Sequence, residues 1–375
     1  AAGTLTPAHI DALAERLARF QAEAPVAPAD TTWGRPALIE AQWAQLLDGL
    51  AATGCPDEAE GWRAWVAEMA PVWRPHWQAR ADGGRVREGH GDLHLANLIA
   101  WREAGEAQDR VTAFDGIEFD PALRWVDTAL DTAFTAMDLF AHQRPDLAWR
   151  FLNAWLDASG EHACLPVWRG HLVYRALVRA MVGRLQGGTQ HAGPPDYLDA
   201  AHRLSAPGPA SLLITHGLSG SGKSFQSQRL LEAHGAIRVR ADVERKRLFG
   251  LAPLAPSHGR VPDGIYTPEA SERSYTHLLA LADQALCAGY PVIVDAAFLK
   301  RHERDRFRQL AQQRGVPFGI LHCEAPEVVL RARIRSRQAE GRDPSEATEA
   351  VMFAQRQSAE PLDAAEMPWV RQVQP

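Results

Sequence analysis

The chain has 375 residues, of which 46% are hydrophobic and 23% charged, and its formal net charge is −6. This length favours two domains over one, and the composition is that of a folded chain rather than a disordered one. The acidic balance argues against a generic nucleic-acid binder, the four scattered cysteines against a disulfide framework, and the lack of a ~20-residue apolar run against a membrane span. We therefore expect a cytoplasmic protein with no membrane partner.

Residues 1–206 are expected to be mostly helical. Apolar side chains recur at helical spacing in 5–20, and the same pattern continues in 36–51, 59–80, 125–141, 145–158 and 166–186. Eleven of the 12 tryptophans lie in this half, and we interpret them as helical core rather than as a stacking surface. Between the helices, 90–119 predicts a loop, two short strands joined by a hairpin with a polar turn near Gly105, and a second loop.

A Pro/Gly/Ser-rich stretch, SAPGPAS at 205–211, is the best candidate for a domain boundary, which gives domains 1–206 and 207–375. After it, strands and helices alternate. The predicted strands are 211–216, 236–240, 291–295, 317–322 and 369–373, and the predicted helices lie near 222–234, 242–248, 268–288, 299–314, 326–339 and 345–357. Apolar strands in this alternation predict an α/β fold, with a parallel five-stranded sheet covered by helices on both faces.

The most specific motif is GLSGSGKS at 217–224, which matches G-x-x-x-x-G-K-[ST], follows an apolar strand and opens a helix. Glycines let successive backbone N–H groups point at one phosphate, and the helix N-terminus adds positive potential. Only three of the 40 basic residues are lysines, and one of them, Lys223, stands where a compact cation must reach the β- and γ-phosphates. We expect ATP to be bound by Gly217, Ser219, Gly220, Ser221, Gly222, Lys223, Ser224 and Phe225.

Several charged residues are candidates for companion roles. Asp242, expected at the end of the second strand, could accept the proton of a substrate hydroxyl or could cap the following helix. Asp295, at the end of the third strand, could hold Mg²⁺ together with Ser224, or could be another cap. Arg333 and Arg337 share one helix face and could close over the transferred phosphoryl group, or form an exposed basic helix with Arg331 and Arg335. Four further arginines could hold an anionic substrate or lie on a solvated face: Arg245, Arg247, Arg301 and Arg304.

Residues 211–375 resemble P-loop kinases of the gluconate kinase, shikimate kinase and zeta-toxin type. The segments that carry the resemblance are GLSGSGKS, ADVERKRL, VIVDAAFLKRHERDRF and RARIRSRQ followed by DPSEA. In such kinases the acidic residue after the second strand contacts the acceptor hydroxyl, and lid arginines contact ATP. The resemblance therefore implies transfer of a phosphoryl group from ATP to a small molecule, with these roles for Asp242 and for Arg333 and Arg337.

The segment HGDLHLAN at 90–97 resembles the H-G-D-x-x-x-x-N catalytic loop of aminoglycoside and choline phosphotransferases. By this resemblance Asp92 would be the base, and Asn97 and Asp115 would hold Mg²⁺. Asp127 and Asp131 resemble later acidic positions of that family more loosely, and an exposed or capping role suits them equally well.

The ATP-binding lobe of that family has no counterpart in this sequence. No lysine precedes position 223 and no G-x-G-x-x-G precedes position 90, so the first half resembles the mainly helical C-terminal lobe alone. We expect it not to hold ATP well.

The combination of the two halves resembles bacterial proteins described as bifunctional aminoglycoside phosphotransferase/ATP-binding proteins. The leading hypothesis is an ATP- and Mg²⁺-dependent kinase that acts on a small-molecule hydroxyl through residues 207–375. One alternative is a polynucleotide 5′-hydroxyl kinase, which would need a basic groove with stacking aromatics. Another is a pseudokinase that binds nucleotide without transfer. The acceptor, the choice of ATP or GTP and the oligomeric state remain open at this point.

Overall fold

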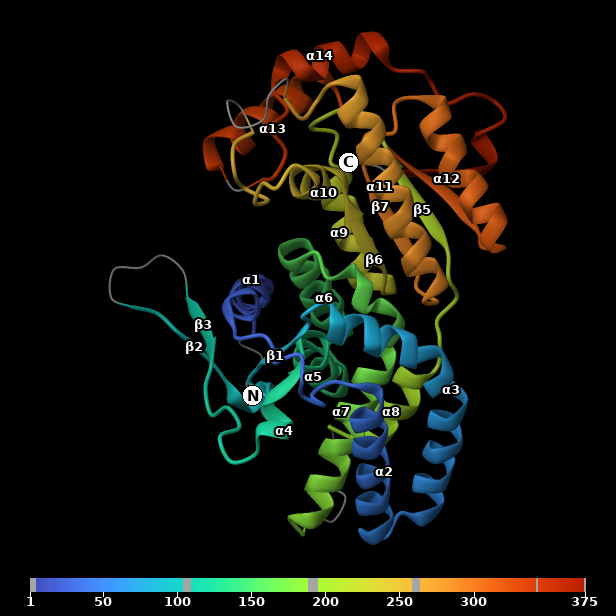
Figure 1. The fold of residues 1–375 in the computed structure, drawn as a ribbon. Coiled ribbons are helices and arrows are strands. Elements are labelled where there is room, and N and C mark those ends of the chain that lie inside the picture. Colours follow the sequence, from blue (N-terminus) through green and yellow to red (C-terminus); the bar gives the residue numbers. More distant parts are fainter. Residues whose placement is uncertain (1–4, 104–108, 188–194, 258–263, 342, 374–375) are drawn as a thin grey trace. The chain divides into compact units, whose positions relative to one another are not determined.

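The computed structural model describes residues 5–103, 109–187, 195–257, 264–341 and 343–373 (Figure 1). The turn expected near Gly105 lies outside these residues. The chain divides into two compact units, Ala1–Pro207 and Gly208–Pro375, which we call the helical unit and the sheet unit. Within the described residues, no helix is both long and apolar enough to cross a membrane.

The helical unit consists of helices and two small antiparallel strand pairs. Its strands are β1 (Val86–Glu88) paired with β4 (Trp125–Asp127), and β2 (Leu98–Trp101) paired with β3 (Arg110–Ala113). Its helices are α1 (Pro7–Glu23), α2 (Pro36–Ala52), α3 (Pro56–Asp82), α4 (Pro121–Arg124), α5 (Thr128–Ala141), α6 (Pro145–Ser159), α7 (Leu165–Leu185) and α8 (Tyr197–Ser205). The expected hairpin is present as β2 and β3. The helix expected from 125 begins only at Thr128, because the three residues before it pair with β1.

Helix α5 forms the centre of the helical unit. All but two of its 14 residues are buried, and it packs against α6 and α7. Tryptophans fill much of the surrounding core: Trp43, Trp73, Trp77, Trp155 and Trp168 are each at most 3% exposed. The tryptophan-rich composition of this half therefore serves packing, as expected.

A buried ion pair fixes the start of α5. Arg80 of α3 donates to both carboxylate oxygens of Asp127, at 2.6 and 2.7 Å, and Asp127 also caps α5 by accepting from the backbone N–H of Ala129 at 2.8 Å. Burial would raise the pKa of Asp127, but the Arg80 charge and its hydrogen bonds hold it below its usual range. Asp127 is thus a buried cap and not an exposed residue.

The sheet unit contains the predicted five-stranded parallel sheet. Its order is β6-β7-β5-β8-β9, formed by β5 (Leu212–His216), β6 (Ile237–Arg240), β7 (Val292–Asp295), β8 (Phe318–Cys323) and β9 (Val370–Val373). In the register, Ile214 of β5 lies opposite Val294 of β7 and Ile320 of β8. The central strands β5, β7 and β8 are nearly continuous apolar runs, as expected for strands covered on both faces, whereas β6 and β9 also carry arginines.

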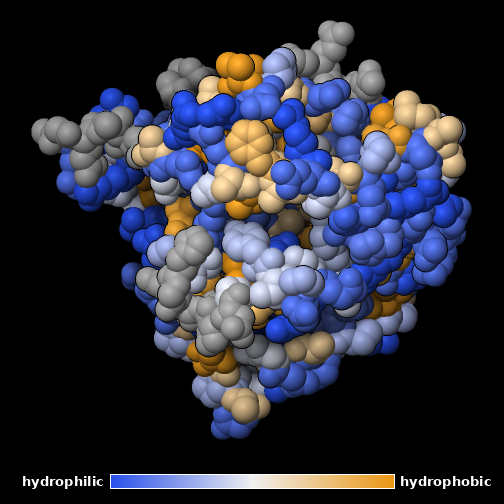
Figure 2. All heavy atoms as spheres, turned by 90° about the horizontal axis from the view of Figure 1, so that it is seen from above, coloured by the Kyte–Doolittle hydropathy of each residue, from blue (hydrophilic) through white to orange (hydrophobic). Residues whose placement is uncertain are grey.

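The helices of the sheet unit are α9 (Lys223–His234), α10 (Ala241–Leu248), α11 (Pro268–Cys287), α12 (Arg301–Arg314), α13 (Glu327–Glu340) and α14 (Glu349–Ser358). The step from β5 to β6 crosses the sheet in the direction opposite to the steps from β6 to β7 and from β7 to β8. Right-handed crossovers therefore place α9 on one face and α11 and α12 on the other. Seen from the side of α13 and α14, the surface is mainly hydrophilic with scattered apolar residues (Figure 2).

Candidate active site

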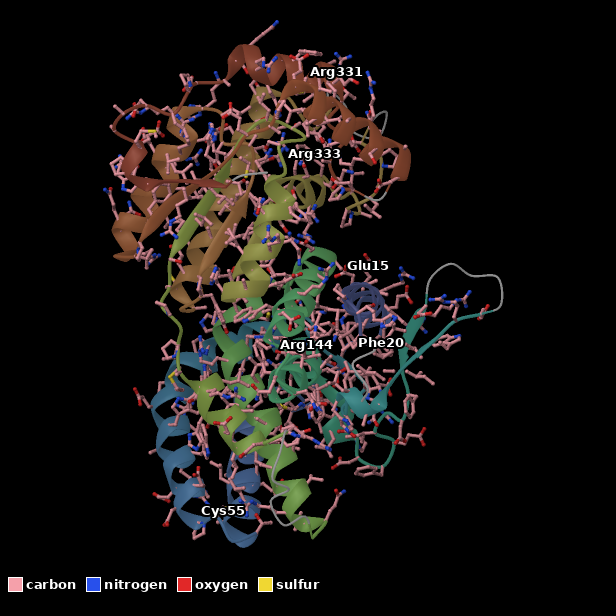
Figure 3. All side chains as sticks on the ribbon, turned by 180° about the vertical axis from the view of Figure 1, so that it is seen from behind. Glu15, Phe20, Cys55, Arg144, Arg331 and Arg333 are labelled. Atoms are coloured by element: carbon pink, nitrogen blue, oxygen red, sulfur yellow. The ribbon has the colours of Figure 1, made fainter. Side chains whose placement is uncertain are left out.

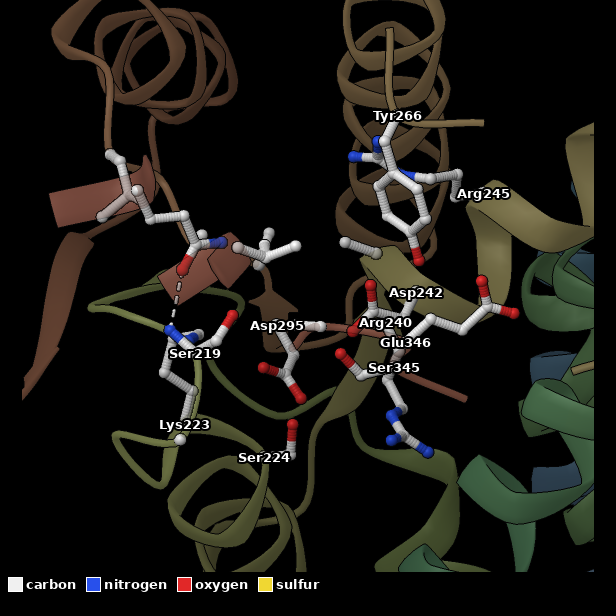
Figure 4. Close-up of a pocket in the computed structure, with 18 of the residues that line it drawn as sticks. Ser219, Lys223, Ser224, Arg240, Asp242, Arg245, Tyr266, Asp295, Ser345 and Glu346 are labelled. Carbon is white, nitrogen blue, oxygen red and sulfur yellow. Dashed lines mark hydrogen bonds between the residues drawn. The ribbon is translucent and has the colours of Figure 1, made fainter. Parts of the chain in front are cut away.

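The sheet unit has a pocket of about 860 Å³ at the edge where its parallel strands end (Figure 4). Ligands of open α/β sheets bind at this edge, because the loops that leave the strands diverge there. Most residues predicted for the site line the pocket: Ser219, Gly220, Gly222, Lys223, Ser224, Phe225, Asp242, Asp295, Arg333 and Arg337. Gly217 and Ser221 belong to the same loop but do not line it.

The phosphate-binding loop leaves β5 after His216 and runs to the start of α9 at Lys223. Its glycines are required by geometry. Gly217 has φ +146°, and a Cβ there would lie 2.3 Å from the carbonyl oxygen of Cys323; a Cβ at Gly220, φ +83°, would lie 2.7 Å from the Leu330 carbonyl. Any side chain at these two positions would collide with backbone atoms, so the sequence G-x-x-G is a packing requirement as well as a conformational one.

Lys223 begins α9 and turns back over the loop. Its Nζ donates to the carbonyl oxygens of Gly217 and Leu218, at 2.9 and 2.8 Å. Burial lowers the pKa of Lys223, while the nearby carboxylates of Asp295 and Asp242 favour its charged form. An ammonium group held at the loop in this way suits contact with the β- and γ-phosphates of a nucleotide.

Asp295 is the last residue of β7, and it is 6% exposed. Ser227 of α9 donates its hydroxyl to Asp295 Oδ2 at 3.2 Å, and the hydroxyl of Ser224 faces the same carboxylate (Figure 4). Carboxylate and hydroxyl oxygens are ligands that Mg²⁺ accepts. Among the described residues no group of three or more His, Cys, Asp or Glu side chains could form a metal site. Asp295 and Ser224 thus supply two oxygen donors of the kind that Mg²⁺ uses together with phosphates and water.

Asp242 lies in the first turn of α10 and not at the end of the second strand, since β6 ends at Arg240. It still faces the pocket, beside Arg240, Tyr266 and Glu346 (Figure 4). Burial raises the pKa of Tyr266, and the negative charges of Asp242 and Glu346 raise it further. The phenol therefore stays protonated and can donate to an acceptor molecule or to a carboxylate.

The arginines near the site fall into two groups. Arg333 Nη1 donates to the Gly220 carbonyl at 3.3 Å, and Arg337 Nη2 donates to the Ala347 carbonyl at 2.9 Å, so both lie at the pocket. Arg331 and Arg335 bind Glu349 at 2.8 and 2.5 Å instead. Figure 3 shows Arg333 on the inner side of α13 and Arg331 toward the outside.

Of the four arginines considered for an anionic substrate, only Arg245 lines the pocket. Its guanidinium lies 5.0 Å from the centre of the Tyr266 ring and donates to the carbonyl of Ile265 at 3.1 Å. Arg304 is 1% exposed and bound to Glu366 at 2.6 Å, and Arg247 and Arg301 pair with neighbouring carboxylates. Arg304 is therefore a buried structural residue, and Arg247 and Arg301 lie outside the pocket lining.

Sequence reasoning missed several pocket residues. Arg240 ends β6 at the ligand edge, which is a signal that could have found it. The others carried no local signal, because long loops or helix turns bring them to the pocket: Tyr266, Lys300, Glu303, Ser345, Glu346 and Gln355.

The His-Gly-Asp loop of the helical unit is held by side chains of α5. Asp131 accepts from the backbone N–H groups of His90 and Gly91, both at 3.0 Å, and Asp138 accepts from Leu95 N at 2.8 Å. Thr135, between them on the same helix face, donates to Leu93 O at 2.7 Å. Asp131 is therefore a buried anchor of the loop and neither exposed nor a helix cap.

Within this loop, Asp92 has two side-chain partners. Asn97 Nδ2 donates to Asp92 Oδ2 at 3.0 Å, and His94 Nε2 lies 3.3 Å from the same oxygen. Because His94 Nδ1 accepts from Ala96 N, its Nε2 carries the hydrogen and donates to Asp92. Burial would raise the pKa of Asp92, but the His94 hydrogen bond, together with the charges of Arg175 and Arg179, brings it below its usual value.

Asp115 follows β3 in an exposed loop with φ +61°. Its neighbour Phe114 connects the loop to both parts of the motif: Phe114 N donates to Asn97 O at 3.0 Å, and Phe114 O lies 2.8 Å from His90 Nε2. The backbone thus brings Asp115 next to the His-Gly-Asp loop. The Asn97 amide is directed at Asp92.

Comparisons with known proteins match a family model to the sheet unit and curated relatives to nearly the whole chain. Residues 212–362 match a family model described as an AAA domain, a range that includes the phosphate-binding loop, Asp242 and Asp295. Curated relatives from Mycobacterium bovis and Mycobacterium tuberculosis, all named as uncharacterized proteins, are 28% identical over 365 residues, which is 95% of this chain and 72% of each relative.

Two solved kinase structures each align with less than half of this chain. A sugar kinase from Janibacter sp. HTCC2649 is 23% identical, with a TM-score of 0.34 over 44% of this chain and 88% of that one. A gluconokinase from Sinorhizobium meliloti 1021 is 24% identical, with a TM-score of 0.31 over 45% of this chain and 86% of that one.

Proposed function

We propose that residues 207–375 form an ATP- and Mg²⁺-dependent kinase domain, which transfers the γ-phosphoryl group to a hydroxyl of a small molecule. The observation that carries the proposal is that one pocket contains both an intact phosphate-binding loop with Lys223 and, on its other side, the carboxylate of Asp242. Its volume, about 860 Å³, is within the range of small-molecule sites.

In the proposed reaction, Asp242 accepts the proton of the acceptor hydroxyl. The oxygen of that hydroxyl forms a bond to the γ-phosphorus at the same time. The bond from that phosphorus to the β–γ bridging oxygen breaks, and ADP leaves. Lys223, Arg333 and Arg337 stabilise the charge on the transferred group and the leaving phosphates. Ser224 and Asp295 would hold Mg²⁺, which neutralises phosphate charge when bound.

A transfer assay tests this assignment. Purified protein with radiolabelled ATP and Mg²⁺ is incubated with sugars, sugar acids, polyols and aminoglycosides, and product is measured. Lys223→Ala should reduce both nucleotide affinity and transfer, whereas Asp242→Asn should keep the affinity and reduce transfer at least 100-fold. Asp283→Asn, on the exposed side of α11, serves as the control. Unchanged transfer by Lys223→Ala would refute the proposal.

The same assay separates the two alternatives. Transfer to the 5′-hydroxyl of a single-stranded oligonucleotide, with binding that weakens steeply with salt, would favour a polynucleotide kinase. Tight nucleotide binding without transfer to any compound would favour a pseudokinase.

For residues 1–206 we propose a kinase-like C-terminal lobe with Asp92 as the base and with Asn97 and Asp115 as Mg²⁺ ligands. The support is the way α5 fixes the loop: four backbone groups between His90 and Leu95 bind three α5 side chains. Asp92→Asn should leave ATP turnover of the sheet unit unchanged. A loss of that turnover would contradict the assignment of separate sites.

A further inference from the structure

The first turn of α9 carries a large aromatic side chain at the wall of the pocket. Phe225 follows Ser224 directly and is 65% exposed. Single exposed apolar side chains are ordinary on a protein surface. Phe225, however, lines the same pocket as Lys223 and Ser224. Its ring is therefore accessible to a molecule that the phosphate-binding loop holds.

The packing of α9 fixes the direction of this ring. Ser227 donates to Asp295 Oδ2 at 3.2 Å, and the hydroxyl of Ser224 faces the same carboxylate (Figure 4). Because each residue turns an α-helix by about 100°, Phe225 lies on a different side of α9 from these two serines. It shares its side with Arg229, one turn further on, whose guanidinium lies 5.8 Å from the centre of the Phe225 ring.

The proposed reaction determines where the nucleoside lies. The attacking and leaving oxygens are in line with the γ-phosphorus, so the rest of the nucleotide extends away from the acceptor and its base Asp242. Asp242 follows β6 and Asp295 ends β7, and both strands lie on the same side of β5 in the sheet. The side of α9 that is turned away from Asp295 carries Phe225. The ring thus stands where the base and the ribose leave the phosphate-binding loop.

We propose that Phe225, flanked by Arg229, forms the nucleoside subsite and that its ring stacks on the base of the bound triphosphate. This inference rests on the proposed nucleotide binding of the sheet unit. The phosphate-binding loop contacts phosphates, which every nucleotide shares with an inorganic phosphate chain. An aromatic ring adds a contact that only the nucleoside can make, because each base offers a π-face for stacking.

Calorimetric titration of the full chain with a non-hydrolysable Mg-ATP analogue and with Mg-tripolyphosphate tests the inference. Tripolyphosphate offers the loop three linked phosphates without base or ribose. Phe225→Ala should weaken binding of the analogue by about fivefold or more, the effect of losing one stacked base, and should change the affinity for tripolyphosphate by less than about twofold. Phe225→Trp keeps an aromatic face and should hold the affinity for the analogue within about threefold of the wild type.

Phe249 provides a matched control. It also has an arginine beside its ring, with the Arg273 guanidinium at 5.1 Å, but it is not among the residues that line the pocket. Phe249→Ala should leave both affinities within about twofold of the wild type, with a thermal melt showing that each variant is folded.

The outcomes separate the inference from the proposed function. Equal weakening of both ligands by Phe225→Ala, or unweakened binding of the analogue, would overturn the inference alone. A wild type that bound tripolyphosphate as tightly as the analogue would also overturn it, since the nucleoside would then contribute nothing. If the wild type bound neither ligand, the proposed function itself would fall and the inference with it.

Discussion

Replacing Arg80 with methionine should destabilise the helical unit by about 3–5 kcal/mol, the usual cost of leaving a buried charge without its partner. Arg80 is 3% exposed and binds both oxygens of Asp127, which is 6% exposed. Glu161, the other carboxylate near Arg80, keeps Arg85 at 2.5 Å. Most of the cost therefore falls on Asp127, which would still have the imidazole of His171 at 3.9 Å, uncharged at neutral pH.

Urea unfolding followed by tryptophan emission measures the stability of the helical unit, because eleven of the 12 tryptophans lie in residues 1–206. Asp127→Asn removes the carboxylate charge and keeps an acceptor for the α5 cap. The double variant Arg80→Met with Asp127→Asn should lose less stability than Arg80→Met alone, because it buries no uncompensated charge. A double variant whose loss equals the sum of the two single losses would refute this explanation.

The loss of stability caused by Arg80→Met should also depend on pH. His171 Nε2 lies 3.9 Å from Asp127 Oδ2, and burial lowers the pKa of His171 to about 4, with the charge of Arg80 contributing to the decrease. Without Arg80, protonation of His171 becomes easier and supplies Asp127 with a cation. The difference in stability between the wild type and Arg80→Met should therefore shrink as the pH falls from 7 to 5. A difference that stays constant over this range would contradict the proposed electrostatics.

Three further outcomes are expected in the sheet unit. Gly217→Ala should abolish nucleotide binding in calorimetry, since its Cβ would meet the Cys323 carbonyl at 2.3 Å. Gly208→Ala, at a position with open space around it and no positive φ, should bind normally. Ser227→Ala removes a hydrogen bond that orients Asp295, so it should raise the Mg²⁺ concentration needed for half-maximal transfer about tenfold. The KM for ATP should change less. Equal changes in the Mg²⁺ requirement and in the KM for ATP would count against a role of Ser227 in holding Asp295. Burial lowers the pKa of His216 to about 3, so the sheet unit should lose stability as the pH falls from about 6.5 toward 3, by up to about 1.4 kcal/mol per pH unit. His216→Gln should flatten this slope in urea titrations followed by circular dichroism, and an unchanged slope would show that other groups cause it.

The sheet unit could be predicted closely because its three central strands, β5, β7 and β8, are largely buried apolar runs. The phosphate-binding loop marks the end of β5. Asp242 was misplaced by two residues, since the helix that carries it starts directly after β6. The three-residue strands β1 and β4 carried no pattern of their own, because pairing and not periodicity defines them.

The parts of the site that could not be predicted from the sequence are those formed by long-range contacts. No local pattern links Gln355 to Ser219, and their contact depends on how α14 packs on α13. In the same way, Asp131 and Thr135 are ordinary residues of an apolar helix in sequence, and their hydrogen bonds to the His-Gly-Asp loop are visible only in the folded unit. A chemical motif could thus be recognised, whereas the supports that orient it could not.

Helix α5 makes the His-Gly-Asp loop part of the core of its unit. Amide protons at His90, Gly91 and Leu95 are shielded by carboxylates of a buried helix, so their exchange with solvent requires that helix to open. These amide protons should therefore exchange more slowly than those of the exposed turn that carries Asp115.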